Sequence, residues 1–117
     1  MSGTNDLDKR SAMRYNPSTV RIDEPVAFEW DEGNIGKNLA KHGVTDAEAE
    51  EVFFDANRKL YPDPRHSQGE NRRIIVGRTE AGRLLFVVFT VRGKRLRVIS
   101  ARDLNKTREA ALYEEAT

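Results

Sequence analysis

The residues of this chain that are best suited to take part in a reaction are arginines of its second half. Four of them come from separate β-forming segments or their ends: Arg72, Arg92, Arg97 and Arg102. A guanidinium group stays charged at every relevant pH, and its planar fork can hold two oxygens of a phosphate. If the strands bring these side chains to one surface, they can stabilise the charge that builds up at a phosphodiester during its cleavage.

Metal-independent RNA cleavage also needs groups that move protons, because the 2′-hydroxyl must lose a proton as it attacks the adjacent phosphorus. The candidates are Lys41, His42 and Glu70. His42 is the natural first choice since imidazole changes its charge near neutral pH, but its position before Gly43 equally suits the C-terminal end of a helix. Lys41 could bind phosphate or simply face solvent. Glu70 could act as a base or pair with a neighbouring arginine.

Further RNA contacts are predicted for a second set of side chains: Arg73, Lys94, Arg95 and Tyr113. Arg95 and Arg97 share one face of their strand by the two-residue period. Tyr113 could stack on a base or pack in the core. Trp30 has the same two options, and we assign it to the core because it directly follows the first expected strand.

The composition excludes several kinds of site. The chain has no cysteine and two histidines, which rules out a thiol nucleophile, a disulfide framework and a Cys/His zinc site. We therefore expect chemistry that needs no metal and no cofactor. The longest apolar run, residues 84–89, is far too short to cross a bilayer, and the N-terminus lacks the apolar stretch of a secretory signal. These features predict a soluble cytoplasmic protein without a membrane partner.

The net charge of +1 conceals a strong asymmetry along the chain. Residues 1–57 hold six Lys/Arg and 12 Asp/Glu, whereas residues 58–108 hold 14 Lys/Arg and four Asp/Glu. So many like charges in one segment repel each other, and a polyanion such as nucleic acid would relieve that repulsion. The alternative is a solvated basic surface that keeps the protein soluble.

The apolar patterning predicts one α+β domain over residues 27–117, preceded by a polar, flexible extension over residues 1–26. The expected strands cover residues 27–30, 73–77, 84–90 and 95–100, with a brief strand at 59–61. Short glycine-containing connections predict an antiparallel meander for the last three strands. The strand at 84–90 is apolar on both faces, so each face should be covered. Three to four strands should thus form one antiparallel sheet.

Two helices are expected before the meander, at residues 34–42 and 45–54, and a third at 105–115. Ile35 and Leu39 recur four residues apart on one face of the first helix, and Gly43 supplies its C-terminal cap. Thr45 and Glu48 have the spacing of a capping box, which marks the start of the second helix.

Four blocks of this sequence resemble the BrnT family: FEWD at 28–31, NLAKHGV at 38–44, GENR at 69–72 and RVISAR at 97–102. The resemblance spans residues 28–113 and implies a RelE-like fold and a type II toxin that cleaves RNA and inhibits translation. It also implies neutralisation by a BrnA-type antitoxin, a ribbon-helix-helix protein through which operator DNA is bound. The chain departs from the family pattern in its N-terminal extension, in Gly36, and in Asp103 and Leu104. The alternative function is a non-catalytic module that binds nucleic acid or a partner in a regulatory complex.

Overall fold

A computed structural model describes residues 27–64 and 71–113. Its elements follow the order β1 (Ala27–Phe28), α2 (Lys37–His42), α3 (Asp46–Val52), β2 (Lys59–Pro62), β3 (Arg72–Arg78), β4 (Leu84–Arg92), β5 (Arg95–Asp103) and the 3-10 turn η1 (Ala110–Tyr113). The expected flexible extension, residues 1–26, and Glu70 lie outside the described residues. In the described part of the chain, no helix is long and apolar enough to span a membrane.

The strands form one five-stranded sheet in the order β1-β5-β4-β3-β2. The pairs from β2 to β5 are antiparallel, as the meander prediction requires. The prediction of three to four strands in a wholly antiparallel sheet was wrong at one edge, where β1 pairs parallel to β5. The chain makes this parallel pair because the two helices and three strands between β1 and β5 carry it back to the same end of the sheet.

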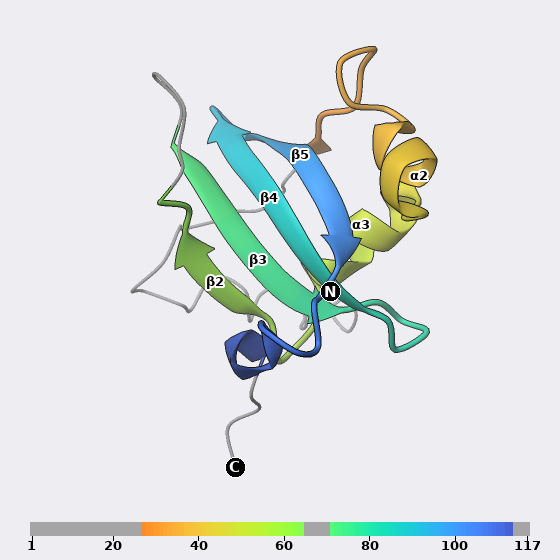
Figure 1. The fold of residues 1–117 in the computed structure, drawn as a ribbon. Helices are drawn as coiled ribbons and strands as arrows, with labels where there is room; N and C mark the ends of the chain where they lie inside the picture. The colour runs from red at the N-terminus through yellow and green to blue at the C-terminus, as the bar shows by residue number, and fades with distance from the viewer. Residues whose placement is uncertain (1–26, 65–70, 114–117) are drawn as a thin grey trace, which may run out of the picture.

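Each face of the sheet carries a core of apolar side chains. In Figure 1, α3 runs behind the sheet, α2 lies beside β5, and η1 sits at the lower end of the sheet. The core on the helix side consists of Val44, Ala49, Val52, Phe53, Leu60, Ile75, Leu85, Val87, Phe89, Leu96, Val98 and Ala101. A smaller core on the opposite face, which we call the open face, consists of Ile74, Val76, Phe86, Val88, Leu104 and Tyr113. Strand β4 contributes alternate residues to both cores, as its apolar sequence predicted.

The structure confirms the capping box predicted for α3, the glycine cap predicted for α2 and the core position predicted for Trp30. The Thr45 hydroxyl accepts from the Glu48 amide at 3.0 Å, and the Glu48 carboxylate accepts from the Thr45 amide at 2.9 Å. Gly43 ends α2 with the left-handed φ of 70°. Trp30 packs partly buried against the helix-side core, and its indole nitrogen donates to Glu50 at 2.6 Å.

Helix α2 is shorter than expected and presents an unexpected face to the sheet. It begins at Lys37 because Gly36 takes a left-handed φ of 70° at the N-cap. Asn34 and Asn38 are buried, whereas Ile35 and Leu39 are exposed. Both apolar residues are therefore exposed to solvent, and Ile35 lies in the turn before α2 and not on the expected helix.

The expected helix over residues 105–115 was also wrong in its described part, where only η1 forms a helical turn. The Asn105 side chain accepts hydrogen bonds from the Thr107 and Arg108 amides, both at 2.9 Å. Glu109 is drawn away toward Arg102 and the Asn105 amide. These side chains offer the backbone alternatives to a regular α-helical ladder.

Candidate active site

Strand register brings arginines from three strands to one end of the open face. Arg72 of β3 pairs with Thr90 of β4, and Thr90 pairs with Arg97 of β5, so the three residues form a row across the sheet. Arg92 and Arg95 pair directly in the next row on the same face. We call Arg72, Arg92, Arg95 and Arg97 the arginine cluster.

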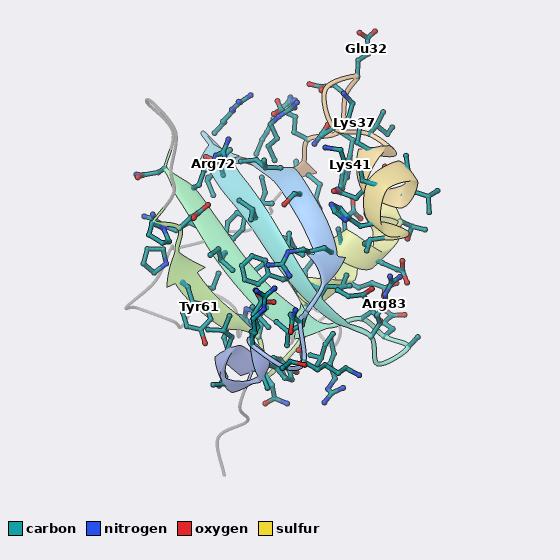
Figure 2. The ribbon with its side chains drawn as sticks, viewed as in Figure 1. Glu32, Lys37, Lys41, Tyr61, Arg72 and Arg83 are labelled. Carbon is teal, nitrogen blue, oxygen red and sulfur yellow. The ribbon has the colours of Figure 1, made fainter. Side chains whose placement is uncertain are left out.

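The residues of the cluster lie close enough on the sheet for their side chains to approach one another. Two strand spacings separate the backbones of Arg72 and Arg97 by about 10 Å, and successive residues on one face of a strand lie roughly 7 Å apart. Long arginine side chains can bridge such distances. Figure 2 shows Arg72 at the end of the sheet where β3 begins.

Two carboxylates from the segment after β1 enter this cluster. The Glu29 amide donates to the Leu96 carbonyl at 2.9 Å, which fixes Glu29 beside β5. Its carboxylate lies 3.4 Å from the Arg97 guanidinium and 3.7 Å from that of Arg92. Asp31 binds Arg97 through two hydrogen bonds of 2.8 and 3.0 Å. Glu29 is thus a carboxylate held between two arginines, in a position where a phosphate bound by them would be close.

The pair between Arg97 and Asp31 is reflected in the titration of both groups. The hydrogen bond to Arg97, followed by that from the Gly33 amide, lowers the pKa of Asp31. The hydrogen bond to Asp31 raises the pKa of Arg97. Half of the Asp31 side chain is exposed, whereas Arg97 is 15% exposed and binds both carboxylate oxygens of Asp31. A phosphate that binds Arg97 would have to displace this bidentate pair.

Arg72 differs from Arg92 and Arg97, which form ion pairs with carboxylates, in the hydrogen bonding of its side chain. Its Nε atom is buried and makes no hydrogen bond. The neighbouring Thr90 hydroxyl donates to the Asn71 carbonyl at 3.0 Å and accepts nothing from the Arg72 Nε atom. Among the described residues the buried Nε of Arg58 also lacks a partner. A buried donor without a partner costs free energy, so an acceptor that reached the Arg72 Nε atom would relieve that cost.

Arg102 shares the open face but not the cluster. Its guanidinium lies 4.1 Å from the centre of the Phe86 ring and binds both carboxylate oxygens of Glu109, at 2.9 and 2.8 Å. The hydrogen bond to Glu109 raises the pKa of Arg102. These contacts occupy the guanidinium fork, so Arg102 is placed to hold the segment before η1 against the sheet.

His42 and Lys41 are not brought to the cluster. They end α2, which runs along β5 so that Asn34 contacts Val98 and Asn38 contacts Ala101. His42 is therefore near Asp103, at the far end of β5, and its charge helps to lower the pKa of Asp103, an effect dominated by Arg83. Six residues of strand separate Asp103 from Arg97, roughly 20 Å.

The remaining predicted residues are dispersed. Arg73 points to the helix side because it pairs with the core residue Phe89. Lys94 lies exposed in the turn between β4 and β5, next to the cluster. Tyr113 is buried in the open-face core and donates its hydroxyl hydrogen to Asp55. Of the two roles that we considered for Tyr113, stacking on a base and packing in the core, its position corresponds to packing.

Sequence reasoning missed Glu29 as a functional candidate. Glu29 lies within the expected strand at residues 27–30 and carries a carboxylate, so its residue type alone was compatible with a functional role. The missing information was that this strand is the parallel neighbour of the arginine-bearing β5. Among the described residues, no group of three or more His, Cys, Asp or Glu side chains is arranged to hold a metal ion.

The comparison with protein families agrees with the resemblance seen in the sequence. A family model described as the ribonuclease toxin, BrnT, of type II toxin–antitoxin systems matches residues 30–108. The crystal structure of the Brucella abortus ribonuclease toxin BrnT is similar at 25% sequence identity, covering 68% of this chain and 95% of that chain, with a TM-score of 0.49. No curated protein matches this chain.

Proposed function

Because the chain belongs to the BrnT family of ribonuclease toxins of type II toxin–antitoxin systems, we propose that it cleaves RNA at the arginine cluster of its open face. The observation that carries this proposal is the pairing of Arg72, Thr90 and Arg97 across three strands, with Arg92 and Arg95 in the next row. In this mechanism Arg72 and Arg97 hold the scissile phosphate from two sides.

The proton acceptor in our proposal is Glu29, which lies between Arg92 and Arg97. It takes the proton of the 2′-hydroxyl while the 2′-oxygen bonds to phosphorus and the bond from phosphorus to the 5′-oxygen breaks. The products are a 2′,3′-cyclic phosphate and a free 5′-hydroxyl. The departing 5′-oxygen needs a proton, and Glu70 in its protonated form, two residues before Arg72 in the chain, is our candidate donor.

The other predicted residues take supporting roles in this proposal. Lys94 and Arg95 extend the positive surface at the turn between β4 and β5 and bind the RNA backbone. Lys41 and His42 bind RNA further along, if the substrate reaches the α2 edge of β5. Arg102 acts as a positioning residue through Glu109.

The biological consequence that we propose follows from the family. Cleavage of RNA in the cytoplasm inhibits translation, and a BrnA-type antitoxin of the ribbon-helix-helix class neutralises the toxin and binds operator DNA. A basic surface that cleaves RNA must be covered in a living cell, and a partner of complementary charge does this.

The experiment that tests the nuclease is a digest of RNA by the purified chain in the presence of a chelator. We expect cleavage that survives chelation and leaves cyclic phosphate ends. The Arg92→Ala and Arg97→Ala variants should each lose on the order of 10²- to 10³-fold in rate. Arg108→Ala is the matched control, since it removes one exposed arginine outside the cluster.

The rival function is a non-catalytic binding module, which the ion pairs of Arg97 with Asp31 and Glu29 favour. Tight binding of RNA that stays intact would support the module. Normal cleavage by the Arg92→Ala and Arg97→Ala variants would instead refute the assignment of the site.

A further inference from the structure

Asn34 is a buried polar side chain that holds the segment from which both carboxylates enter the arginine cluster. It is 4% exposed, although it lies in the loop between β1 and α2. Its side-chain nitrogen donates to the Glu29 carbonyl at 2.9 Å and to the Val98 carbonyl at 3.0 Å. Its side-chain oxygen accepts from the Asp31 amide at 2.8 Å. Both amide hydrogens of the side chain and one of its lone pairs are therefore in use.

These hydrogen bonds continue the edge of the sheet beyond the end of β1. The parallel pair of β1 with β5 covers two residues, and the Glu29 amide then donates to the Leu96 carbonyl at 2.9 Å. Asn34 supplies the donor for the next carbonyl on this edge of β5, that of Val98. Because Leu96 and Val98 are the two chain neighbours of Arg97, the segment is anchored on both sides of that arginine.

The anchored segment places its carboxylates on Arg97. The Arg97 guanidinium lies 3.4 Å from the Glu29 carboxylate and 2.8 Å from that of Asp31. The loop passes so close that a Cβ on Gly33 would lie 2.5 Å from a guanidinium nitrogen. Glu32 of the same loop is exposed and points away from the sheet in Figure 2. The acidity of the loop alone therefore does not bring a carboxylate to Arg97, and the path of the backbone decides which ones reach it.

The chemistry of an asparagine fits this position. Two carbonyl oxygens need donors here, and an ionised aspartate has none to offer. An aspartate would also add a third carboxylate beside those of Glu29 and Asp31, and like charges so close together repel. An alanine would leave the two carbonyls and the Asp31 amide without this partner.

We propose that Asn34 is a positioning residue for the reaction at the arginine cluster. By fixing the Glu29 carbonyl and the Asp31 amide, it holds the Glu29 carboxylate where it can take the proton of the 2′-hydroxyl. The part of this inference that concerns catalysis rests on the proposed function. The positioning itself rests on the three hydrogen bonds of the Asn34 side chain.

Asn38 provides the matched control, because it is an equally buried asparagine on the same edge of β5. It is 3% exposed, and its side-chain oxygen accepts from the Ala101 amide at 2.9 Å. In the described part of the chain, no hydrogen bond joins its side chain to residues 29–31. Asn38→Ala should thus destabilise the fold without moving the two carboxylates.

The first measurement is the cleavage of an RNA oligonucleotide by the full chain with chelator present, at a temperature where circular dichroism shows each variant folded. Asn34→Ala should lower kcat about 10- to 100-fold, because the proton acceptor is misplaced. It should not raise KM, because Arg72 and the other arginines that bind RNA remain. Asn38→Ala should keep kcat and KM within about twofold of wild type.

Asn34→Asp separates hydrogen bonding from packing. It keeps the size and the acceptor of the side chain but removes both donors, so kcat should fall at least as far as in Asn34→Ala. Wild-type kcat in Asn34→Asp would overturn the proposal, since the side chain would then act by filling space. A rise in KM with unchanged kcat in Asn34→Ala would overturn it too, and so would an equal loss of kcat in Asn38→Ala.

The second measurement does not depend on cleavage. The hydrogen bond to Arg97, followed by that from the Gly33 amide, lowers the pKa of Asp31 below its ordinary value of 3.8. In an NMR titration of the Asp31 carboxyl carbon, this pKa should move up toward 3.8 in Asn34→Ala and stay at its wild-type value in Asn38→Ala. An Asp31 pKa that does not change in Asn34→Ala would refute the positioning.

The two measurements separate this inference from the nuclease proposal. If the wild-type chain leaves RNA intact but the Asp31 titration depends on Asn34 and not on Asn38, the nuclease proposal fails and the positioning by Asn34 stands. If the wild-type chain cleaves RNA and Asn34→Ala matches Asn38→Ala in kcat and in the Asp31 titration, only the inference on Asn34 is refuted.

Discussion

Replacing Arg72 with methionine should move activity and stability in different directions. The Arg72 Nε atom is buried without a partner, and a buried unsatisfied donor costs about 1–3 kcal/mol. Methionine has a similar length and no donor, so the free energy of unfolding should stay the same or rise by about 1 kcal/mol. The loss of a guanidinium that stabilises the phosphorane should lower the cleavage rate by about 10²- to 10³-fold.

Arg102→Met is the matched control for this change. Arg102 contacts the Phe86 ring and binds both oxygens of Glu109, so its removal breaks two charge-assisted hydrogen bonds. The free energy of unfolding should fall by about 1–2 kcal/mol. The cleavage rate of the folded variant should change by less than about tenfold, because Arg102 does not touch the phosphate in our mechanism.

The two measurements are single-turnover cleavage of a short RNA oligonucleotide with chelator present and urea unfolding followed by tryptophan fluorescence. The reasoning is refuted in either of two ways. If Arg72→Met cleaves RNA within about threefold of wild type, Arg72 does not stabilise the transition state. If it loses more than about 2 kcal/mol of stability, the guanidinium makes a contact that the structure lacks.

Four further outcomes can be checked on the same preparations. Gly77→Ala should lower the free energy of unfolding by about 1–3 kcal/mol in urea titrations, because its Cβ would lie 2.9 Å from a valine side chain of α3. Asn38→Leu should cost about 1–3 kcal/mol by the same measurement, since it leaves the Ala101 amide buried without an acceptor. The hydrogen bond from Arg83 lowers the pKa of Asp103 below its ordinary value of 3.8, so this pair contributes stability above that pH and loses it as the pH falls through the lowered value. Urea midpoints at pH 7, 5 and 3 should therefore fall less at pH 3 in an Arg83→Met variant than in wild type. Filter binding of single-stranded RNA at increasing salt should give a log–log slope of about −3, the value for four phosphate contacts at about 0.7 each.

The sequence was most informative where local rules decide the structure. The three strands of the meander were located within a few residues because β-branched and apolar runs alternate with glycine-containing turns. The capping box at Thr45 and the glycine cap at Gly43 were located for the same reason, since each depends on residues within one helical turn.

The sequence was least informative where distant segments compete. The spacing of Ile35 and Leu39 predicted one helical face, but the helix begins only at Lys37. Both residues are exposed because the Asn34 and Asn38 side chains bind the edge of β5 instead. The parallel β1 is two residues long, too short for its own sequence to specify a neighbour. The expected last helix does not form in its described part because the Asn105 side chain accepts hydrogen bonds from backbone amides. The spacing of apolar residues does not reveal such hydrogen bonds.

The candidate site shows the same division. The two-residue period placed Arg95 and Arg97 on one face, and this follows from β5 alone. The alignment of Arg72 with Arg97 depends on two strand registers and on a bulge beside Val88, none of which the sequence fixes locally. Glu29 joins the cluster only through the β1–β5 pair, so its role could not be inferred before the fold was known.

The charge asymmetry of the sequence acquires a different meaning in the fold. Acidic residues of the first half do not merely face water: Glu29 and Asp31 bind Arg97, and Glu48 binds Arg83. Part of the positive charge in the second half is therefore neutralised within the molecule. These ion pairs hold the first half of the chain against the second. In the described part of the chain, the four arginines of the cluster have two carboxylates, Glu29 and Asp31, among them, and phosphate is the group that we propose completes the cluster. The number of arginines in the second half thus overstates the RNA site, and Arg72, the member with an unsatisfied buried donor, is the residue on which binding and catalysis should depend most.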